Sequence, residues 1–232
     1  MTCFIDSEVA FTVFENFPVN IVKCRFALSE YSMALYHEFN IDIPPCVSSA
    51  VFKRQAEFLA GRYCARRSLS LAGECSGKVG VASNRQPLWP DGYIGSISHN
   101  DSSSVAIASK KQICSYLGVD IEKTLNEETI EEIQSLILDF DEIGVIRHIN
   151  LSFVVAFSVC FSSKESIFKA FFPKVGKYFD FSMAKLVRID VDRKTAVFVL
   201  DSDFRQQYEL PSAVEVLYMF DSSDVITCVA IS

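Results

Sequence analysis

The sequence has no apolar stretch long enough to span a membrane. Its longest apolar run, residues 151–161, is far shorter than the ~20 residues that a transmembrane helix needs. The N-terminal region also lacks a basic segment followed by an apolar one, because Asp6, Glu8 and Glu15 interrupt it, so we expect no signal peptide. Internal repeats and low-complexity tracts are absent as well. We therefore expect a soluble, cytoplasmic protein.

The chain also lacks an excess of positive charge. Its 22 lysines and arginines are outnumbered by 29 aspartates and glutamates, which gives a formal net charge of −7 and a pI near 5.0. Broad binding to nucleic acids or to anionic membranes needs a positive field, so we expect neither partner. Any phosphate chemistry must rest on a local group of basic residues.

The cysteines follow no pattern typical of a metal site, because no CxxC pair and no metal-ligand spacing is present. An even number of thiols allows disulfides. In a chain this apolar, however, we expect buried, inert thiols in a reducing compartment. The eight cysteines are Cys3, Cys24, Cys46, Cys64, Cys75, Cys114, Cys160 and Cys228.

What the chain does have is a large apolar fraction. Of its 232 residues, 50% are hydrophobic and 20 are Phe, which excludes intrinsic disorder and provides for one large domain or two small ones. Apolar spacing predicts helices over residues 51–71, 127–140 and 153–171, with Pro173 ending the last. Strands are predicted over residues 94–98, 105–109 and 117–122, and hairpins over residues 186–200 and 214–231. This mixed order predicts an α+β fold with antiparallel sheets.

The sharpest local signal is the segment Gly118-Val119-Asp120-Ile121-Glu122. Side chains two apart on a strand share a face, so Asp120 and Glu122 lie side by side while Val119 and Ile121 point into a core. Neighbouring carboxylates repel each other unless a cation or a proton lies between them. A hard cation such as Mg2+, bound by one or two carboxylates and by substrate phosphates, would satisfy the arrangement. The alternative is an exposed edge of an acidic protein.

A second segment, residues 161–170, places charges within an aromatic stretch. On a helix, Glu165 and Lys169 are neighbours one turn apart, and such a pair on a surface contributes about 0.2–0.5 kcal/mol. Here phenylalanines surround Glu165 and two lysines, Lys164 and Lys169, which favours a partly buried polar site. These phenylalanines are Phe157, Phe161, Phe168 and Phe171.

Two weaker signals concern phosphate binding. The segment GSISH, residues 95–99, has small residues that allow a ligand to approach closely, and His99 is positioned to donate to a phosphate, although a single His at a strand end is more often structural. The helix over residues 51–71 carries a basic flank, and guanidinium groups suit bidentate phosphate recognition. Solvated arginines extended along an apolar face are the alternative. The arginines are Arg54, Arg62, Arg66 and Arg67.

Together and in this order, these segments resemble the 4′-phosphopantetheinyl transferases. The matching pieces are FKRQAEFLAGRYCARRSL (52–69), RQPLWPDGYIGSISHN (85–100), GVDIEK (118–123) and FSSKESIFKAFFP (161–173). The first two are similar in particular to the enterobactin synthetase component D subgroup, which modifies siderophore-assembly enzymes. The resemblance implies two similar α/β lobes related by pseudo-twofold symmetry, with coenzyme A in the cleft between them. Residues 1–117 would form the lobe that binds coenzyme A phosphates, and residues 118–232 the lobe with the metal site.

The resemblance also implies roles for individual residues. Asp120, Glu122 and Glu165 would hold Mg2+, or Mn2+ in its place, against the pyrophosphate of coenzyme A. Lys169 would stabilise charge that develops on the pyrophosphate, and Glu165 would also deprotonate the attacking serine. The surfactin-type branch has a Lys-Pro turn where this chain has Gln86-Pro87, and Arg85 is the neighbouring basic residue. The residues implied to bind coenzyme A are Arg54, Arg62, Arg85, Ser98 and His99.

The implied reaction is the transfer of phosphopantetheine from coenzyme A to the serine of an apo aryl or peptidyl carrier domain, with release of 3′,5′-ADP. One alternative is a non-catalytic module that binds coenzyme A or a carrier domain. Another is an acyltransferase with His99 as base, which would leave three carboxylates without a role. Because the site lies in one chain, we expect a monomer. Candidate contacts for an acidic carrier are Arg66, Arg67 and the basic segment 174–177.

Overall fold

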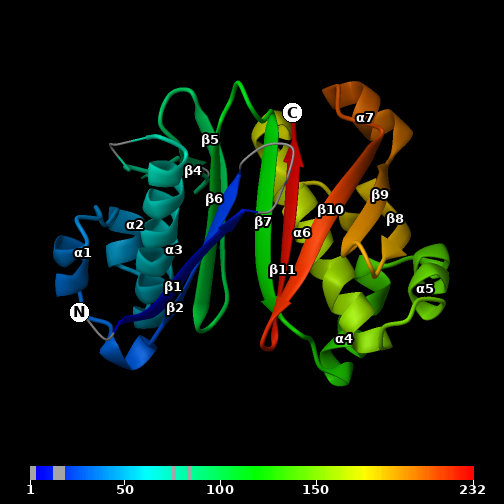
Figure 1. Cartoon of the computed structure of the whole chain (residues 1–232), viewed down its shortest axis with the longest axis horizontal. Helices are drawn as coiled ribbons and strands as arrows, with labels where there is room; N and C mark the ends of the chain where they lie inside the picture. Colours follow the sequence, from blue (N-terminus) through cyan, green and yellow to red (C-terminus); the bar gives the residue numbers. More distant parts are fainter. Residues whose placement is uncertain (1–3, 13–18, 75–76, 83–84) are drawn as a thin grey trace. The chain divides into compact units, whose positions relative to one another are not determined.

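The computed structural model describes residues 4–12, 19–74, 77–82 and 85–232 (Figure 1). Within these residues the chain forms two compact units, one of residues up to Leu117 together with Ser232, and the other of Gly118–Ile231. Each unit contains both helices and strands, which confirms the α+β class. None of the helices in the described ranges is both long and apolar enough to cross a membrane.

The first unit is built on a four-stranded sheet in the order β1-β2-β6-β5. Its strands are β1 (Ile5–Thr12), β2 (Asn20–Phe26), β6 (Ser103–Lys110) and β5 (Tyr93–His99), and neighbours are antiparallel. Helix α3 (Phe52–Leu71) packs against β2, β5 and β6 (Figure 1). A Cβ atom at Gly61 would lie 3.1 Å from Ile97 Cγ2, so the absence of a side chain lets α3 lie close to β5.

Short elements complete the first unit. A 3-10 helix (Leu28–Glu30) and two short helices, α1 (Ala34–Glu38) and α2 (Pro45–Ser48), precede α3. After α3 comes a small antiparallel pair, β3 (Gly80–Val81) and β4 (Pro87–Leu88). The core between the sheet and these helices is aromatic and aliphatic, with Phe4, Leu59 and Ala60 fully buried.

The second unit is built on a five-stranded sheet in the order β7-β11-β10-β9-β8. Its strands are β7 (Tyr116–Lys123), β11 (Asp224–Ile231), β10 (Ala213–Asp221), β9 (Thr195–Leu200) and β8 (Ala184–Asp190). The long helix α6 (Phe153–Val175) packs against β11, β10 and β8 (Figure 1). The remaining elements are α4 (Glu127–Ile137), α5 (Phe140–Arg147), a 3-10 helix (Phe181–Met183) and α7 (Ser202–Tyr208).

Two of the predicted helix ends are wrong. The helix expected over residues 127–140 ends earlier, at Ile137, and a second helix begins at Phe140. Asp139 caps this second helix by accepting from the Glu142 N–H, while the Glu142 carboxylate accepts from the Asp139 N–H. The last helix continues through Pro173 to Val175 and ends at Gly176, whose φ is +72°. A proline in the last turn removes one backbone hydrogen bond, and Val175 beyond it is buried.

The thiols agree with the expectation of buried cysteines except at one position. Among the described cysteines, Cys46 is exposed and the other five are buried and unbridged. The Sγ atoms of Cys24 and Cys64 lie 3.3 Å apart in the core of the first unit, and their proximity and burial raise the pKa of Cys24. The predictions for Cys3 and Cys75 lie outside the described residues.

Candidate functional site

Strand β7 lies close beneath helix α6. A Cβ atom built at Gly118 would lie 2.0 Å from the Ser166 carbonyl oxygen and 2.9 Å from the Ala170 backbone nitrogen. Only glycine permits that separation, because an L side chain would overlap the helix backbone. The close approach brings the side chains of α6 onto the carboxylates of β7, which are distant from them in sequence.

Asp120 is the centre of this arrangement. It is 1% exposed, so the interpretation of an exposed strand edge is wrong for this residue. Lys169 Nζ donates to its Oδ1 at 2.6 Å, and Ser162 Oγ donates to its Oδ2 at 2.7 Å. Both donors come from α6, and Val119 and Ile121 on either side of Asp120 are fully buried, as the strand pattern predicts. Burying a carboxylate is costly unless it is paired and hydrogen-bonded, and these two donors provide that pairing.

Hydroxyl groups connect this site to the neighbouring strand. Ser162 Oγ and Thr227 Oγ1 on β11 are 2.9 Å apart, and Thr227 Oγ1 donates to the Ser162 carbonyl at 2.8 Å. Ser166 Oγ donates to the Thr227 carbonyl at 3.0 Å. The only sequence signal for these hydroxyl groups is that Ser162 and Ser166 lie one turn apart on the predicted helix. They fix α6 on the sheet without adding charge to the site.

Glu165 lies half-buried beside the Lys169–Asp120 pair. Burial raises its pKa, the charge of Lys169 opposes that shift, and the charge of Asp120 adds to it. Lys169 therefore faces two carboxylates, one on its own helix and one on β7. The pair predicted from the i,i+4 spacing is part of a polar cluster.

The carboxylate oxygens of this cluster are the type of ligand that a hard cation binds. Mg2+ prefers carboxylate oxygens, and Asp120 and Glu165 are close enough to repel each other. Glu122 follows on the same face of β7 by strand alternation and is half-buried. Among the described residues no three His, Cys, Asp or Glu side chains are gathered as a metal site, and Lys169 occupies one oxygen of Asp120.

A separate buried ion pair holds the other side of α6. Lys164 Nζ lies 2.7 Å from Glu142 Oε1, and both side chains are almost fully buried. Lys164 also donates to the carbonyls of Ile137 and Phe181, and Glu142 accepts from the Leu186 N–H at 2.8 Å. This pair joins α4, α5, α6 and β8. The sequence signal for Glu142 is its place three residues after Asp139, where a capping box is typical.

In the first unit, the structure brings Arg54 and His99 together. Arg54 Nη1, on α3, lies 2.7 Å from Nε2 of His99, the last residue of β5. Glu57, which the sequence analysis did not single out, lies 3.7 Å from Arg54 Nη1 and 3.8 Å from His99 Nδ1. The sequence feature that could have identified Glu57 is its position one helical turn after Lys53 and Arg54. Burial raises the pKa of Glu57, and the charges of Lys53 and Arg54 oppose that shift.

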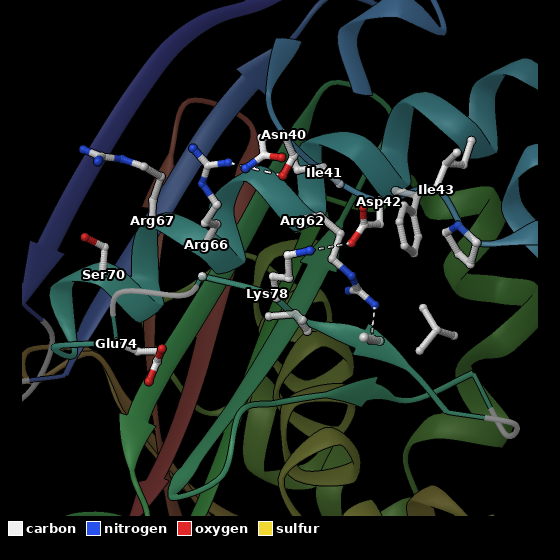
Figure 2. A pocket seen from close by; sticks show the side chains of 16 residues that line it. Asn40, Ile41, Asp42, Ile43, Arg62, Arg66, Arg67, Ser70, Glu74 and Lys78 are labelled. Carbon is white, nitrogen blue, oxygen red and sulfur yellow. Dashed lines mark hydrogen bonds and ion pairs between the residues drawn. The ribbon is translucent and has the colours of Figure 1, made fainter. Parts of the chain in front are cut away.

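Arg62 faces a cavity of about 580 Å3 in the first unit (Figure 2). Its Nη2 donates to the Gly80 carbonyl at 2.9 Å and its guanidinium lies over the Phe58 ring at 4.5 Å, while its Nε has no hydrogen-bond partner among the described residues. Burial, and then the charge of Arg54, lowers the pKa of Arg62 to about 10. Arg66 and Lys78 also line this cavity.

The other two residues predicted to bind coenzyme A are Ser98 and Arg85, and their roles stay predictions. Ser98 is buried, and adjacent strand residues point to opposite faces, so its side chain is on the face of β5 away from His99. Ile97 and His99 share the face toward α3, as the contact of Ile97 with Gly61 indicates. Arg85 is exposed at the turn between β3 and β4, with a φ of +68°.

Comparisons with known proteins identify the family to which the chain belongs. A model of the 4'-phosphopantetheinyl transferase N-terminal domain matches residues 44–109, and a model of the 4'-phosphopantetheinyl transferase superfamily matches residues 116–227. Enterobactin synthase component D of Salmonella typhi is 37% identical over 163 residues, which cover 69% of this chain and 68% of that protein. Its Escherichia coli K12 counterpart is 37% identical over 119 residues, 51% of this chain and 55% of that protein. The 4'-phosphopantetheinyl transferase Npt of Nocardia iowensis is 28% identical over 142 residues, 60% of this chain and 62% of that protein. The resemblance found in the sequence is confirmed, and the chain belongs to the 4′-phosphopantetheinyl transferase superfamily.

Proposed function

We propose that this protein transfers the 4′-phosphopantetheine arm of coenzyme A to a serine of an apo carrier domain, in the cytoplasm. The serine oxygen forms a bond to the β-phosphorus, the pyrophosphate bond breaks, and 3′,5′-ADP leaves with its electron pair. The observation that carries the proposal is the contact of Lys169 with buried Asp120 beside Glu165. Because related proteins are named enterobactin synthase component D, we further propose an aryl or peptidyl carrier of a siderophore synthetase.

In the second unit, Asp120, Glu122 and Glu165 would hold Mg2+, with Mn2+ as the other candidate. When bound, the cation neutralises charge on the pyrophosphate. Lys169 places its ammonium group where the leaving phosphate gains charge, and such electrostatic stabilisation is the main requirement of phosphoryl transfer. Glu165 accepts the proton of the serine hydroxyl, directly or through water. Its raised pKa makes it a stronger proton acceptor than an ordinary carboxylate.

In the first unit, Arg54, His99 and Arg62 would bind coenzyme A phosphates. The Arg54–His99 contact supports a shared phosphate for these two residues. Arg62 has an unused N–H donor beside the cavity, which supports a second anionic group there. Arg85 remains a proposed contact at its turn. Ser98 remains a proposed contact beside His99 near the end of β5.

The basic residues proposed to bind the carrier domain also make contacts within this protein. Arg66 donates to the carbonyls of Phe39 and Asn40, and Arg67 pairs with Glu8. In the second unit Lys174 pairs with Glu209. These contacts are exposed and weak, so they leave the charges available to an acidic partner. We therefore retain them as a proposed carrier surface, and a monomer as the proposed working form.

The test is intact-mass spectrometry of an apo aryl carrier domain after incubation with the protein, coenzyme A and Mg2+. We expect a gain of one phosphopantetheine arm, lost with chelator and in Glu122→Ala. If aryl, peptidyl and acyl carriers all stay unmodified while coenzyme A binds tightly, the protein is a binding module. Acyl transfer from a coenzyme A thioester that survives the chelator would instead support the acyltransferase alternative.

A further inference from the structure

The contact between Arg54 and His99 fixes the proton on the imidazole ring. A guanidinium group carries five N–H donors and no acceptor. At 2.7 Å from Arg54 Nη1, His99 Nε2 must therefore be the acceptor and carry no proton. The hydrogen of a neutral ring then lies on Nδ1, which faces Glu57 Oε2 at 3.8 Å. Without ligand, His99 is neutral, and its outer nitrogen is a hydrogen-bond acceptor.

A phosphate cannot bind to this arrangement unchanged. Phosphate oxygens need donors, and an unprotonated Nε2 would present a lone pair to them. When Arg54 turns its N–H groups to a phosphate, Nε2 loses this donor and can take a proton from the solvent. The imidazolium that results donates from Nε2 to the phosphate and from Nδ1 toward Glu57. An ionised partner on each side favours the charged ring.

Glu57 is suited to this task by its place on α3. Its side chain is 12% exposed, whereas those of Arg54 and Lys53 are about half exposed. Among the described contacts of the first unit, the charged groups near His99 include Arg54, Glu57, and the pair of Lys53 with Asp101 at 2.5 Å, with Lys53 Nζ also 3.9 Å from Glu57. These four charges sum to zero while His99 is neutral. A bound phosphate makes the group negative, and one added proton reduces that imbalance.

From this geometry, and resting on the proposed phosphate-binding role of Arg54 and His99, we infer that Glu57 is a positioning residue that makes coenzyme A binding take up a proton on His99. The step balances simply: one proton passes from solvent to Nε2, the ring gains one positive charge, and no covalent bond to the ligand changes. Coenzyme A affinity then decreases as the pH rises above the pKa of the ring in the complex.

The experiment is isothermal titration calorimetry of coenzyme A into the intact protein. Measuring at pH 7.5 in two buffers of different ionisation enthalpy gives the number of protons taken up. Protons that the ligand's own phosphates exchange are removed by subtracting the value for His99→Gln. We expect the wild type to take up more protons than His99→Gln, and Glu57→Gln to fall toward the His99→Gln value. Glu57→Asp keeps the charge and should recover part of the uptake.

The affinity of Glu57→Gln should also depend on pH in a way that a structural role does not explain. Removing the carboxylate lowers the pKa of the bound ring. For a shift of about one unit, the loss of affinity should be largest, up to roughly ten-fold, at a pH below the ring pKa of the bound variant where the free ring is still neutral, and it should disappear at a pH above the ring pKa of the wild-type complex. Lys53→Met is the matched control, because Lys53 contacts the same carboxylate from the solvent side. It should take up as many protons as the wild type.

The outcomes separate this inference from the proposed function. Weakened binding in His99→Gln, with equal proton uptake in wild type and His99→Gln, would overturn the inference and leave the phosphate-binding role intact. If Glu57→Gln takes up as many protons as the wild type when coenzyme A binds, the positioning role of Glu57 is overturned. Unchanged affinity in His99→Gln would remove both. If Glu57→Gln does not fold, the pH dependence of Glu57→Asp against Lys53→Met decides the same question.

Discussion

Replacing Gly118 by alanine tests whether the close approach of β7 and α6 creates the active arrangement. The added Cβ would lie 2.0 Å from the Ser166 carbonyl oxygen and 3.0 Å from the Ala170 Cβ. The nearer contact is with a backbone atom, so no flexible side chain can move aside to relieve it. Contacts of that kind essentially never fall below 3.0 Å, so helix and strand must separate by about 1 Å. That movement lengthens the 2.6 Å contact of Lys169 with Asp120 beyond hydrogen-bond distance.

The expected cost follows from these distances. Overpacking of this kind destabilises a protein by about 1–3 kcal/mol, and a misplacement of about 1 Å in an active site slows turnover about 100-fold. We therefore expect Gly118→Ala to remain folded, to lose stability in urea, and to transfer phosphopantetheine about 100-fold more slowly at saturating coenzyme A. The assay is the initial rate of mass gain on an apo carrier domain.

Gly144 provides a matched control in the same unit. It lies within α5, and a Cβ atom there would meet nothing within 4 Å. Gly144→Ala should therefore leave turnover unchanged and stabilise the helix by roughly 0.5–1 kcal/mol. If Gly118→Ala turns over within two-fold of the wild type, the close approach of β7 and α6 is not what aligns Lys169, and the reasoning fails.

Three further predictions concern other parts of the two units. Glu142→Gln leaves Lys164 charged and buried, so we expect a loss of about 3–5 kcal/mol in urea unfolding, and a loss below about 1 kcal/mol would contradict the buried pair. Arg54→Ala removes a charged donor worth about 1.5–3 kcal/mol, so the Kd for coenzyme A should rise about 10- to 100-fold, and an unchanged Kd would refute its phosphate contact. Chelation should stop transfer and added Mg2+ should restore it, whereas Glu122→Ala should stay slow at any Mg2+ concentration; full activity in chelator would exclude the metal.

Most of the fold that positions the sites could be predicted from periodicity. Helix α3, strands β5, β6 and β7, and the hairpin of β10 with β11 lie where apolar spacing places them. The errors occur where a local contact competes with the pattern. The capping box at Asp139 starts a new helix near the end of the predicted range 127–140, and α6 continues beyond Pro173 to Val175. Strands β1 and β2 could not be predicted, because β1 is largely exposed and lacks alternation.

The residues of the candidate site could be predicted from the sequence, but the contacts between them could not. Strand alternation places Asp120 and Glu122 on one face, and helical spacing joins Glu165 to Lys169, but the 2.6 Å contact links positions 49 residues apart. The one local clue was Gly118, whose missing side chain matters only when a helix backbone lies against it. The same alternation bears on Ser98 and His99, because adjacent strand residues face opposite sides, so the strand pattern alone does not bring their side chains together. The general inference is that short motifs identify the reacting groups, while the pairings among them depend on where two backbones can approach.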